Sequence, residues 1–198
     1  GAAMEKGRSL GLCVFPGLEI CSVEEVHVLA LFDTLESALA MQDFVYGNLK
    51  GENNPDIFGY QVVADAEDQV TDQNPRLLIG AASVDLNHLV NHIHDLGGLA
   101  VAAHIDRTAF SILGQLGFIP PDLPLDAVEV SYRLRPEDAE KTLQIGRNIP
   151  CITSSDAHFP SEIGRVSTKF LMKTPCISEL KMALRCENGR RIIRSTPS

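Results

Sequence analysis

The stretch Pro150-Cys151-Ile152-Thr153-Ser154-Ser155-Asp156-Ala157-His158 is a short apolar run that ends at small hydroxyl residues, a carboxylate and an imidazole. Such a run is typical of a buried parallel strand, and the active sites of barrel and doubly wound folds lie at the carboxyl ends of these strands. Asp156 and His158 can point the same way and offer an oxygen and a nitrogen to one metal ion. Because Asp-x-His alone is more often a chance occurrence or a structural turn, its meaning depends on the other strand ends.

Three other predicted strands carry residues of the same chemical kind. Glu19 follows the short apolar run 12–15, and His27 lies near the start of the apolar run 26–32. His104 ends the clearest buried strand of the chain. Each residue taken singly has a simpler explanation, because an exposed loop can carry a glutamate and a buried histidine can be satisfied by a hydrogen bond.

The combined pattern is more specific than any of its members. Histidine and carboxylate ligands on different strands suit Zn, Mn or Fe, whereas an all-oxygen site would suit Mg or Ca. Glu19 can bridge two ions, because a carboxylate has two oxygens and lowers the repulsion between neighbouring cations. We therefore predict one pocket, at the carboxyl ends of parallel strands, that contains Glu19, His27, His104, Asp156 and His158.

Composition limits the class of protein. The 198 residues, 44% of them hydrophobic and 22% charged, are ordinary for one α/β domain. The five cysteines never occur as Cys-x-x-Cys, which argues against a disulfide framework and a zinc knuckle. The sequence has no apolar run of about 18 residues and no signal peptide, so we expect a cytoplasmic protein without a membrane partner. The formal charge of −9 predicts no duplex nucleic acid partner, although a local cationic or metal site can still bind a phosphate.

The predicted elements alternate between strands and helices over residues 1–193. Strands are predicted at 12–15, 26–32, 99–103, 127–130, 150–153 and 166–172, and helices at 1–10, 33–49, 85–96, 136–147 and 178–187. The polar, turn-rich stretch 50–76 predicts an excursion from the core or a lid, with a strand or hairpin near 60–64. The tail 194–198 is predicted to fray.

Several helix ends have recognisable signals. Asp33 with Glu36 offers a capping box for the second helix, and Ser83 or Asp85 can cap the third. The first helix has no capping residue in front of it, so the sequence begins inside an element.

His88 and His92 have the i, i+4 spacing of a helical zinc site. They lie opposite the leucine stripe of their predicted helix and lack the glutamate of a His-Glu-x-x-His motif. We therefore predict that both are solvent-facing and metal-free.

The motifs together resemble the polymerase and histidinol phosphatase (PHP) family of metal-dependent phosphoesterases. The resemblance spans nearly the whole chain, in the family's order and approximate spacing. It depends on four segments, which are Pro16-Gly17-Leu18-Glu19-Ile20, His27-Val28-Leu29-Ala30-Leu31-Phe32, Ala103-His104 and Ser154-Ser155-Asp156-Ala157-His158.

The resemblance implies a distorted (β/α)7 barrel with two or three divalent metal ions (Mn, Fe or Zn) at the carboxyl ends of its strands. It assigns Glu19, His27, His104, Asp156 and His158 as ligands, with Glu19 as a bridge and with Asp156 and His158 acting in catalysis through the metals. The sequence departs from the family pattern in two respects. Ile105 stands where many relatives have proline, which is a minor difference, and the sequence contains neither a His-x-His strand nor a Thr-Asp-His strand end. We therefore expect the N-terminal strands of the domain to be missing from this sequence.

The function implied by the resemblance is hydrolysis of a small phosphomonoester or a nucleotide phosphodiester by a metal-bound hydroxide. Arg107, Arg133 and Arg165 follow predicted strand ends or turns and can hold the phosphate, although each is equally well explained as a surface arginine. The alternative is a non-catalytic PHP-like domain whose partial metal site serves stability or partner binding. A related amidohydrolase is disfavoured, because no strand end carries a lysine. Oligomeric state is not predictable from these features.

Overall fold

The computed structural model describes residues 1–143, 145 and 149–194. The central sheet has five strands in the order β1-β2-β5-β6-β7. These are β1 (Gly17–Cys21), β2 (His27–Leu31), β5 (Leu99–Ala102), β6 (Ala127–Val130) and β7 (Cys151–Thr153). The β1–β2 and β2–β5 pairs are antiparallel, and the β5–β6 and β6–β7 pairs are parallel.

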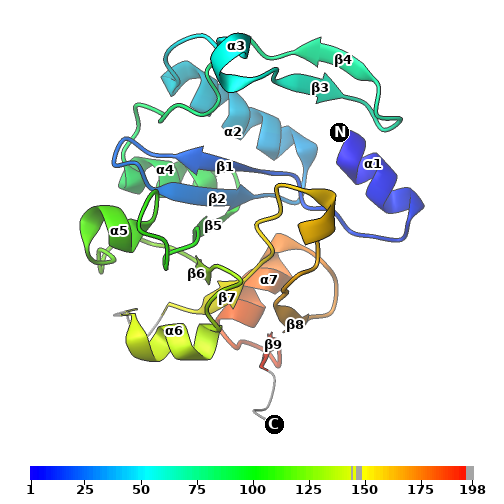
Figure 1. Cartoon of the computed structure of the whole chain (residues 1–198). Helices are drawn as coiled ribbons and strands as arrows, with labels where there is room; N and C mark the ends of the chain where they lie inside the picture. Colours follow the sequence, from blue (N-terminus) through cyan, green and yellow to red (C-terminus); the bar gives the residue numbers. More distant parts are fainter. Residues whose placement is uncertain (144, 146–148, 195–198) are drawn as a thin grey trace.

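The fold is therefore a mixed α/β fold (Figure 1). Within the described residues the five strands form an open sheet, so the predicted (β/α)7 barrel is not confirmed. Two small antiparallel sheets accompany it, one of β3 (Val62–Ala64) with β4 (Val70–Gln73) and one of β8 (Lys169–Leu171) with β9 (Arg191–Ile193).

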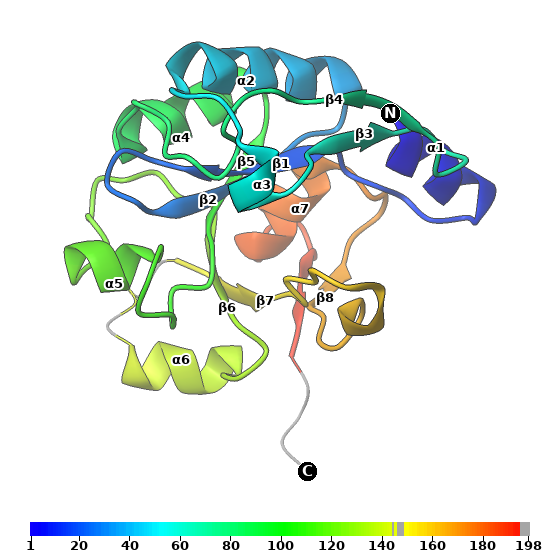
Figure 2. The same cartoon turned by 45° about the horizontal axis from the view of Figure 1, so that its top comes forward.

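The helices cover both faces of the sheet. They are α1 (Ala2–Ser9), α2 (Leu35–Asn48), α3 (Pro55–Phe58), α4 (Leu86–Asp95), α5 (Ile112–Leu116), α6 (Pro136–Thr142) and α7 (Ile177–Leu184), and a 3-10 turn spans Pro160–Glu162. Figure 2 shows α2 and α4 on one side of the sheet and α7 on the other. No helix in the described part of the chain is long and apolar enough to cross a membrane.

The period-2 alternation of strand residues divides the core into two clusters. Val28, Ala30, Val128 and Val130 pack in the larger cluster with residues of α2 and α4. Their alternating neighbours face the other way, where α7 packs on Leu99, Val101 and Ala127 and where Leu29 and Leu31 also lie. We call this second side the α7 face. Near one end of the sheet this face carries the polar residues Glu19, His27 and Glu129.

Gly98 shows how closely α4 and the sheet are packed. A Cβ atom there would lie 2.4 Å from Cε1 of Phe32, which is fully buried, and 2.9 Å from Cγ2 of Ile93. Only glycine fits at position 98, and its small size lets β5 pack directly on the core after the turn that follows α4. Gly97, with φ of +76°, ends the helix as its sequence position suggests.

Two helix caps test the predicted signals. Asp85 is the N-cap of α4 and accepts a hydrogen bond from the backbone N–H of His88, as expected for one of the two candidates. The predicted Asp33–Glu36 capping box is wrong, because Thr34 is the N-cap of α2 and accepts from the N–H of Ser37. Asp33 instead accepts a hydrogen bond of 2.8 Å from the N–H of Ile177, and so connects the end of β2 to the start of α7.

The first predicted strand is displaced. Residues 12–15 are not a strand, and β1 begins at Gly17, so Glu19 lies inside a strand and not in a loop after one. Pro16 cannot donate to a ladder, but its carbonyl accepts from the N–H of Phe32 and sets the register of the hairpin. A Cβ on Gly17 would lie 2.5 Å from the carbonyl oxygen of Ala30, so glycine permits the close approach of the two strands.

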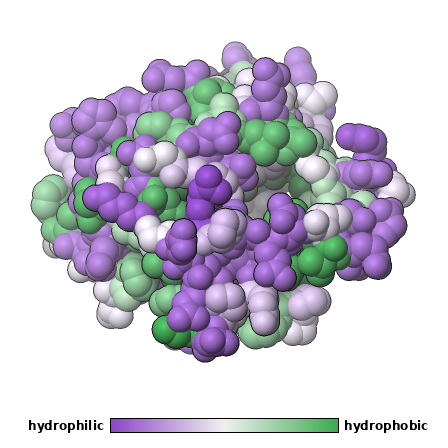
Figure 3. All heavy atoms as spheres, turned by 90° about the horizontal axis from the view of Figure 1, so that it is seen from above, coloured by the Kyte–Doolittle hydropathy of each residue, from purple (hydrophilic) through white to green (hydrophobic). Residues whose placement is uncertain are grey.

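Three other predicted bounds shift. β8 and α7 are shorter than predicted, and α6 ends at Thr142 because Leu143 adopts an extended conformation. The predicted helix end at 147 and the tail 195–198 lie outside the described residues. The excursion 50–76 contains α3 and the β3–β4 hairpin, both strands of which are exposed. In the view from above, hydrophobic patches are scattered among hydrophilic side chains (Figure 3).

The ion pair between Glu179 of α7 and Arg190 predicts how the stability of the fold depends on pH. Arg190 donates to both carboxylate oxygens of Glu179, at 2.7 and 2.9 Å, and lowers the pKa of Glu179 to about 2. The pKa is therefore lower in the folded protein than in the unfolded chain, where the ordinary value is 4.5. This contribution to stability is present above pH 4.5 and is lost as the pH falls from there toward 2.

We expect the melting temperature of wild type to exceed that of E179Q near neutral pH and the difference to shrink in acid. Thermal unfolding from pH 7 to pH 3 measures it, with E187Q, at an exposed glutamate beyond the same helix, as the control. A difference of constant size down to pH 3 would contradict the assignment.

Candidate metal centre

Glu19 and His27 are brought together by the β1–β2 hairpin. His27 lies opposite Cys21 in the antiparallel register, and Glu19 is two residues before Cys21, so all three side chains share the α7 face. Nδ1 of His27 lies 3.1 Å from Oε1 of Glu19. The ring of Phe110 stacks on His27 with centroids 4.9 Å apart and limits the positions that the imidazole can take.

His104 reaches the same carboxylate from the end of β5. Strict alternation would place it on the face of Ala100 and Ala102, but its φ of +32° ends the alternation. The side chain is buried, and its Nε2 lies 3.3 Å from Oε1 of Glu19. Nδ1 of His104 is also buried and has no hydrogen-bond partner within the described residues. A buried polar atom without a partner is costly, and so it suggests a missing ligand.

The side chains of Glu19, His27 and His104 fit a divalent metal ion, and we call these three residues the metal-type group. One ligand atom from each of Glu19, His27 and His104 lies within 4.8 Å of the other two. The hydrogen bonds from His104 and then His27 hold the pKa of Glu19 far below its usual range, against the opposing effect of burial. A carboxylate that stays ionised beside two imidazoles is a donor set typical of Zn, Mn or Fe sites.

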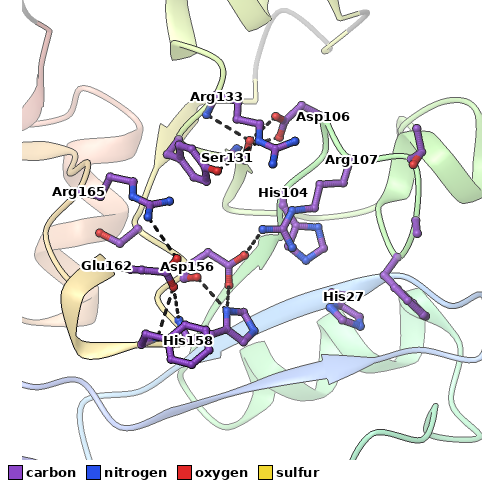
Figure 4. A pocket seen from close by; sticks show the side chains of 16 residues that line it. His27, His104, Asp106, Arg107, Ser131, Arg133, Asp156, His158, Glu162 and Arg165 are labelled. Atoms are coloured by element: carbon purple, nitrogen blue, oxygen red, sulfur yellow. Dashed lines mark hydrogen bonds and ion pairs between the residues drawn. The ribbon is translucent and has the colours of Figure 1, made fainter.

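Asp156 and His158 line the same pocket but do not belong to this group of three. The pocket, of about 650 Å³, has His27 and His104 on one wall and Asp156 and His158 on another. The Asp156 carboxylate forms an ion pair with Arg107, and Nδ1 of His158 lies 3.0 Å from the backbone carbonyl of Asp156 (Figure 4). Of the five predicted ligands, then, Glu19, His27 and His104 meet directly. Four of the five line the pocket, and Glu19, which was also predicted there, does not.

All three predicted phosphate-binding arginines line this pocket. Arg107 pairs with Asp156, and Arg165 pairs with Glu162 at 3.2 Å. Arg133 has no carboxylate partner within 4.0 Å among the residues that the structure describes, and its nearest polar contact is the hydroxyl of Tyr132 at 3.3 Å. Its guanidinium is therefore the most available cation of the three.

Sequence reasoning missed two polar pairs beside the pocket. Glu129, inside β6, accepts a hydrogen bond of 2.5 Å from Oγ of Ser154, and burial raises the pKa of its carboxyl despite that bond. Asp106 accepts from both the N–H and the hydroxyl of Ser131, at 2.8 and 2.6 Å. A glutamate within an apolar strand was the available signal for the first pair, because a buried acid needs a partner. The second pair had no signal in the sequence.

The two helical histidines differ from each other. His88 is exposed and its Nδ1 lies 2.6 Å from Asp85, as predicted for a surface residue. His92 is only half-exposed, because its ring stacks on Phe44 with centroids 3.9 Å apart. The residues described form no metal-type group that contains either histidine.

Comparison with known proteins tests the resemblance predicted from the sequence. Residues 143–188, which include β7, Asp156 and His158, match the family model PHP-associated. The resemblance to the PHP family is confirmed. The fold is similar to that of the lesion-specific endonuclease EndoQ of Pyrococcus furiosus, with a TM-score of 0.65 and 19% identity over 89% of this chain.

The same similarity is found with a structure of endonuclease Q bound to a 27-mer duplex with an abasic lesion at its active site. The uncharacterized protein YqxK of Bacillus subtilis is 29% identical over 111 residues. This chain spans 40% of the length of the endonuclease, and the alignment covers 28% of YqxK.

The expectation that duplex nucleic acid can be excluded is wrong. A protein of similar fold has been crystallised with a duplex substrate that carries an abasic lesion. The net charge of −9 describes the whole surface, whereas contact with a backbone phosphate depends on a local set of cations such as those of this pocket.

Proposed function

We propose that this chain carries the active site of a metal-dependent phosphoesterase that cleaves a phosphodiester bond in nucleic acid. The observation that supports this proposal best is the shared pocket. The imidazoles of His27 and His104, both of which contact the Glu19 carboxylate, line the same cavity as three arginines. A phosphate held by the arginines would therefore lie close to the metal-type group.

Glu19, His27 and His104 would hold one divalent ion, of Mn, Fe or Zn, and we assign Asp156 and His158 to further ions in the same pocket. A divalent ion supplies a water molecule of lowered pKa as nucleophile and neutralises negative charge on the phosphate. The protein residues orient the ester. Arg133 donates to non-bridging phosphate oxygens, and the buried position of His104 keeps the metal-type group fixed while substrate enters.

The walls of the pocket favour a nucleotide unit over a bare phosphate. Phe110, Tyr132 and Phe159 line it with exposed rings, although the chain contains only 8 Phe and 3 Tyr. Arg165 lies over the Tyr132 ring, 4.3 Å from its centroid. Aromatic rings beside arginines are a common platform for stacked bases next to bound phosphates.

The test is hydrolysis by the purified chain with manganese, iron or zinc added. The substrates are a duplex with an abasic site, bis(p-nitrophenyl) phosphate as a diester and p-nitrophenyl phosphate as a monoester. We expect metal-dependent cleavage of the diesters that a chelator abolishes. Exclusive cleavage of the monoester would indicate a phosphomonoesterase. Metal binding without hydrolysis of any substrate would favour a non-catalytic PHP-like domain.

We expect R133A to lower kcat/KM on the diester about tenfold, since a charge-assisted hydrogen bond contributes roughly 1.5–3 kcal/mol and 1.4 kcal/mol corresponds to a factor of ten. The matched control is R135A, which removes an exposed arginine two residues along the chain that pairs with Asp138 and does not line this pocket. Equal effects of the two substitutions would argue against a phosphate contact by Arg133.

A further inference from the structure

Glu129 occupies the middle of the polar end of the sheet. It is the third residue of β6, a strand whose four residues are all buried, and β6 lies between β5 and β7. Alternation puts Glu129 on the α7 face with Ala127, while Val128 and Val130 face the larger core cluster. The side chain is 2% exposed and does not line the pocket, so it does not meet substrate directly.

This single residue contacts the turns on both sides of its strand. Oγ of Ser154, in the turn after β7, donates to Oε2 of Glu129 at 2.5 Å. In the turn after β5, the backbone N–H of Ile105 donates to the backbone carbonyl of Glu129 at 2.8 Å. Residue 129 therefore contacts both turns, one through its backbone carbonyl and the other through its carboxylate, although the two turns are far apart in sequence.

Both turns contain a backbone conformation that non-glycine residues rarely adopt. His104 has φ of +32° and Asp156, two residues after Ser154, has φ of +45°. Such conformations persist only where surrounding contacts hold them, and they direct these two side chains into the pocket. The contacts to Glu129 are among those that can hold each turn in this conformation.

We infer that Glu129 is a positioning residue, which fixes the turns bearing His104 and Asp156 relative to each other so that side chains from separate strands face one pocket. This inference extends the proposed function, since it concerns the same site. The arrangement of the turns, however, can be measured without metal or substrate.

The experiment compares E129A, E129Q and wild type as complete 1–198 chains. The matched control is D126A, which removes a second buried carboxylate immediately before the same strand, at its opposite end. Asp126 accepts from the N–H of Ala100 and from Nε2 of His94, away from the pocket. Amide hydrogen exchange of the metal-free proteins reports on each turn, and titration with Co2+, followed by its visible absorption spectrum, reports on metal affinity and geometry.

E129A is expected to raise exchange in residues 153–158 more than in residues 103–107, because the backbone contact to Ile105 remains. It should also weaken Co2+ binding about 10- to 100-fold, as is typical when a group that orients metal ligands is removed. E129Q keeps an acceptor for Ser154 and should restore most of the affinity and the cobalt spectrum. D126A should lower the melting temperature and leave the spectrum unchanged.

Unchanged exchange of residues 153–158 in E129A, or the same general increase that D126A gives, would overturn the inference. If E129A does not fold, S154A removes only the contact to the second turn. It should then raise exchange in 153–158 and leave 103–107 as in wild type, and equal effects on both turns would count against the bridge. If wild type binds no Co2+, the proposed function fails, and the exchange data alone decide the role of Glu129.

Discussion

An H104A variant is expected to lose metal binding and about a thousandfold of the phosphoesterase activity, because metal stabilisation of the transition state contributes several kcal/mol and each 1.4 kcal/mol corresponds to a factor of ten. His104 is the buried member of the group of three, with Nε2 at 3.3 Å from Glu19. Its removal leaves Glu19 and His27 as two ligands on one hairpin, which is too few for a stable catalytic site. Metal content of the purified protein and kcat/KM on a diester substrate measure the two losses.

The matched control is H88A, which removes an exposed histidine from α4. It should retain both metal and activity. The melting temperature of metal-free H104A must remain close to that of wild type, so that lost activity reports on the site and not on unfolding. An H104A protein that keeps its metal and most of its activity would require a different set of ligands.

The sequence was sufficient to find the three residues that meet, although part of the reasoning was wrong. Glu19 was predicted in a loop at the carboxyl end of a strand, and it lies within β1, two residues before the partner of His27. The three residues still meet, because β2 runs antiparallel to β5. The start of β2 and the end of β5 therefore lie at the same edge of the sheet, as the 5.2 Å between the His27 and His104 rings shows.

Other features depended on contacts that no local pattern contains. The left-handed conformation of His104 reverses the side-chain direction that alternation predicts. The partners of Glu129 and Asp106 lie 25 residues away along the chain. Strand direction is also a tertiary property, because an apolar run of four or five residues is equally compatible with a parallel and an antiparallel neighbour.

The position of Asp156 separates two explanations of the Asp-x-His motif that opened the sequence analysis. As a structural turn, it needs only the backbone geometry and the contact between His158 and the Asp156 carbonyl. As part of an active site, it needs the carboxylate itself to face the pocket. The carboxylate does so, is 15% exposed, and is paired there with Arg107, a residue that we propose can also bind phosphate.

A D156A variant is therefore expected to lose activity about a hundredfold, since we assign Asp156 to a metal ion, metal stabilisation of the transition state contributes several kcal/mol, and each 1.4 kcal/mol is a factor of ten. The variant should still bind one divalent ion, because Glu19, His27 and His104 remain intact. Metal stoichiometry should fall relative to wild type if Asp156 holds a further ion, as we propose. Metal analysis and diester kinetics on the same preparations measure both quantities.

D138A is the control for D156A, because Asp138 also pairs with an arginine, Arg135, but on the exposed surface of α6. It should leave activity and metal content unchanged, as exposed ion pairs contribute little. D156N keeps the shape of the side chain and removes its charge. If D156N were as active as wild type while D156A were inactive, the carboxylate would act by shape and hydrogen bonding alone. Full activity and unchanged metal content in both variants would mean that the Asp-x-His motif is only a structural turn.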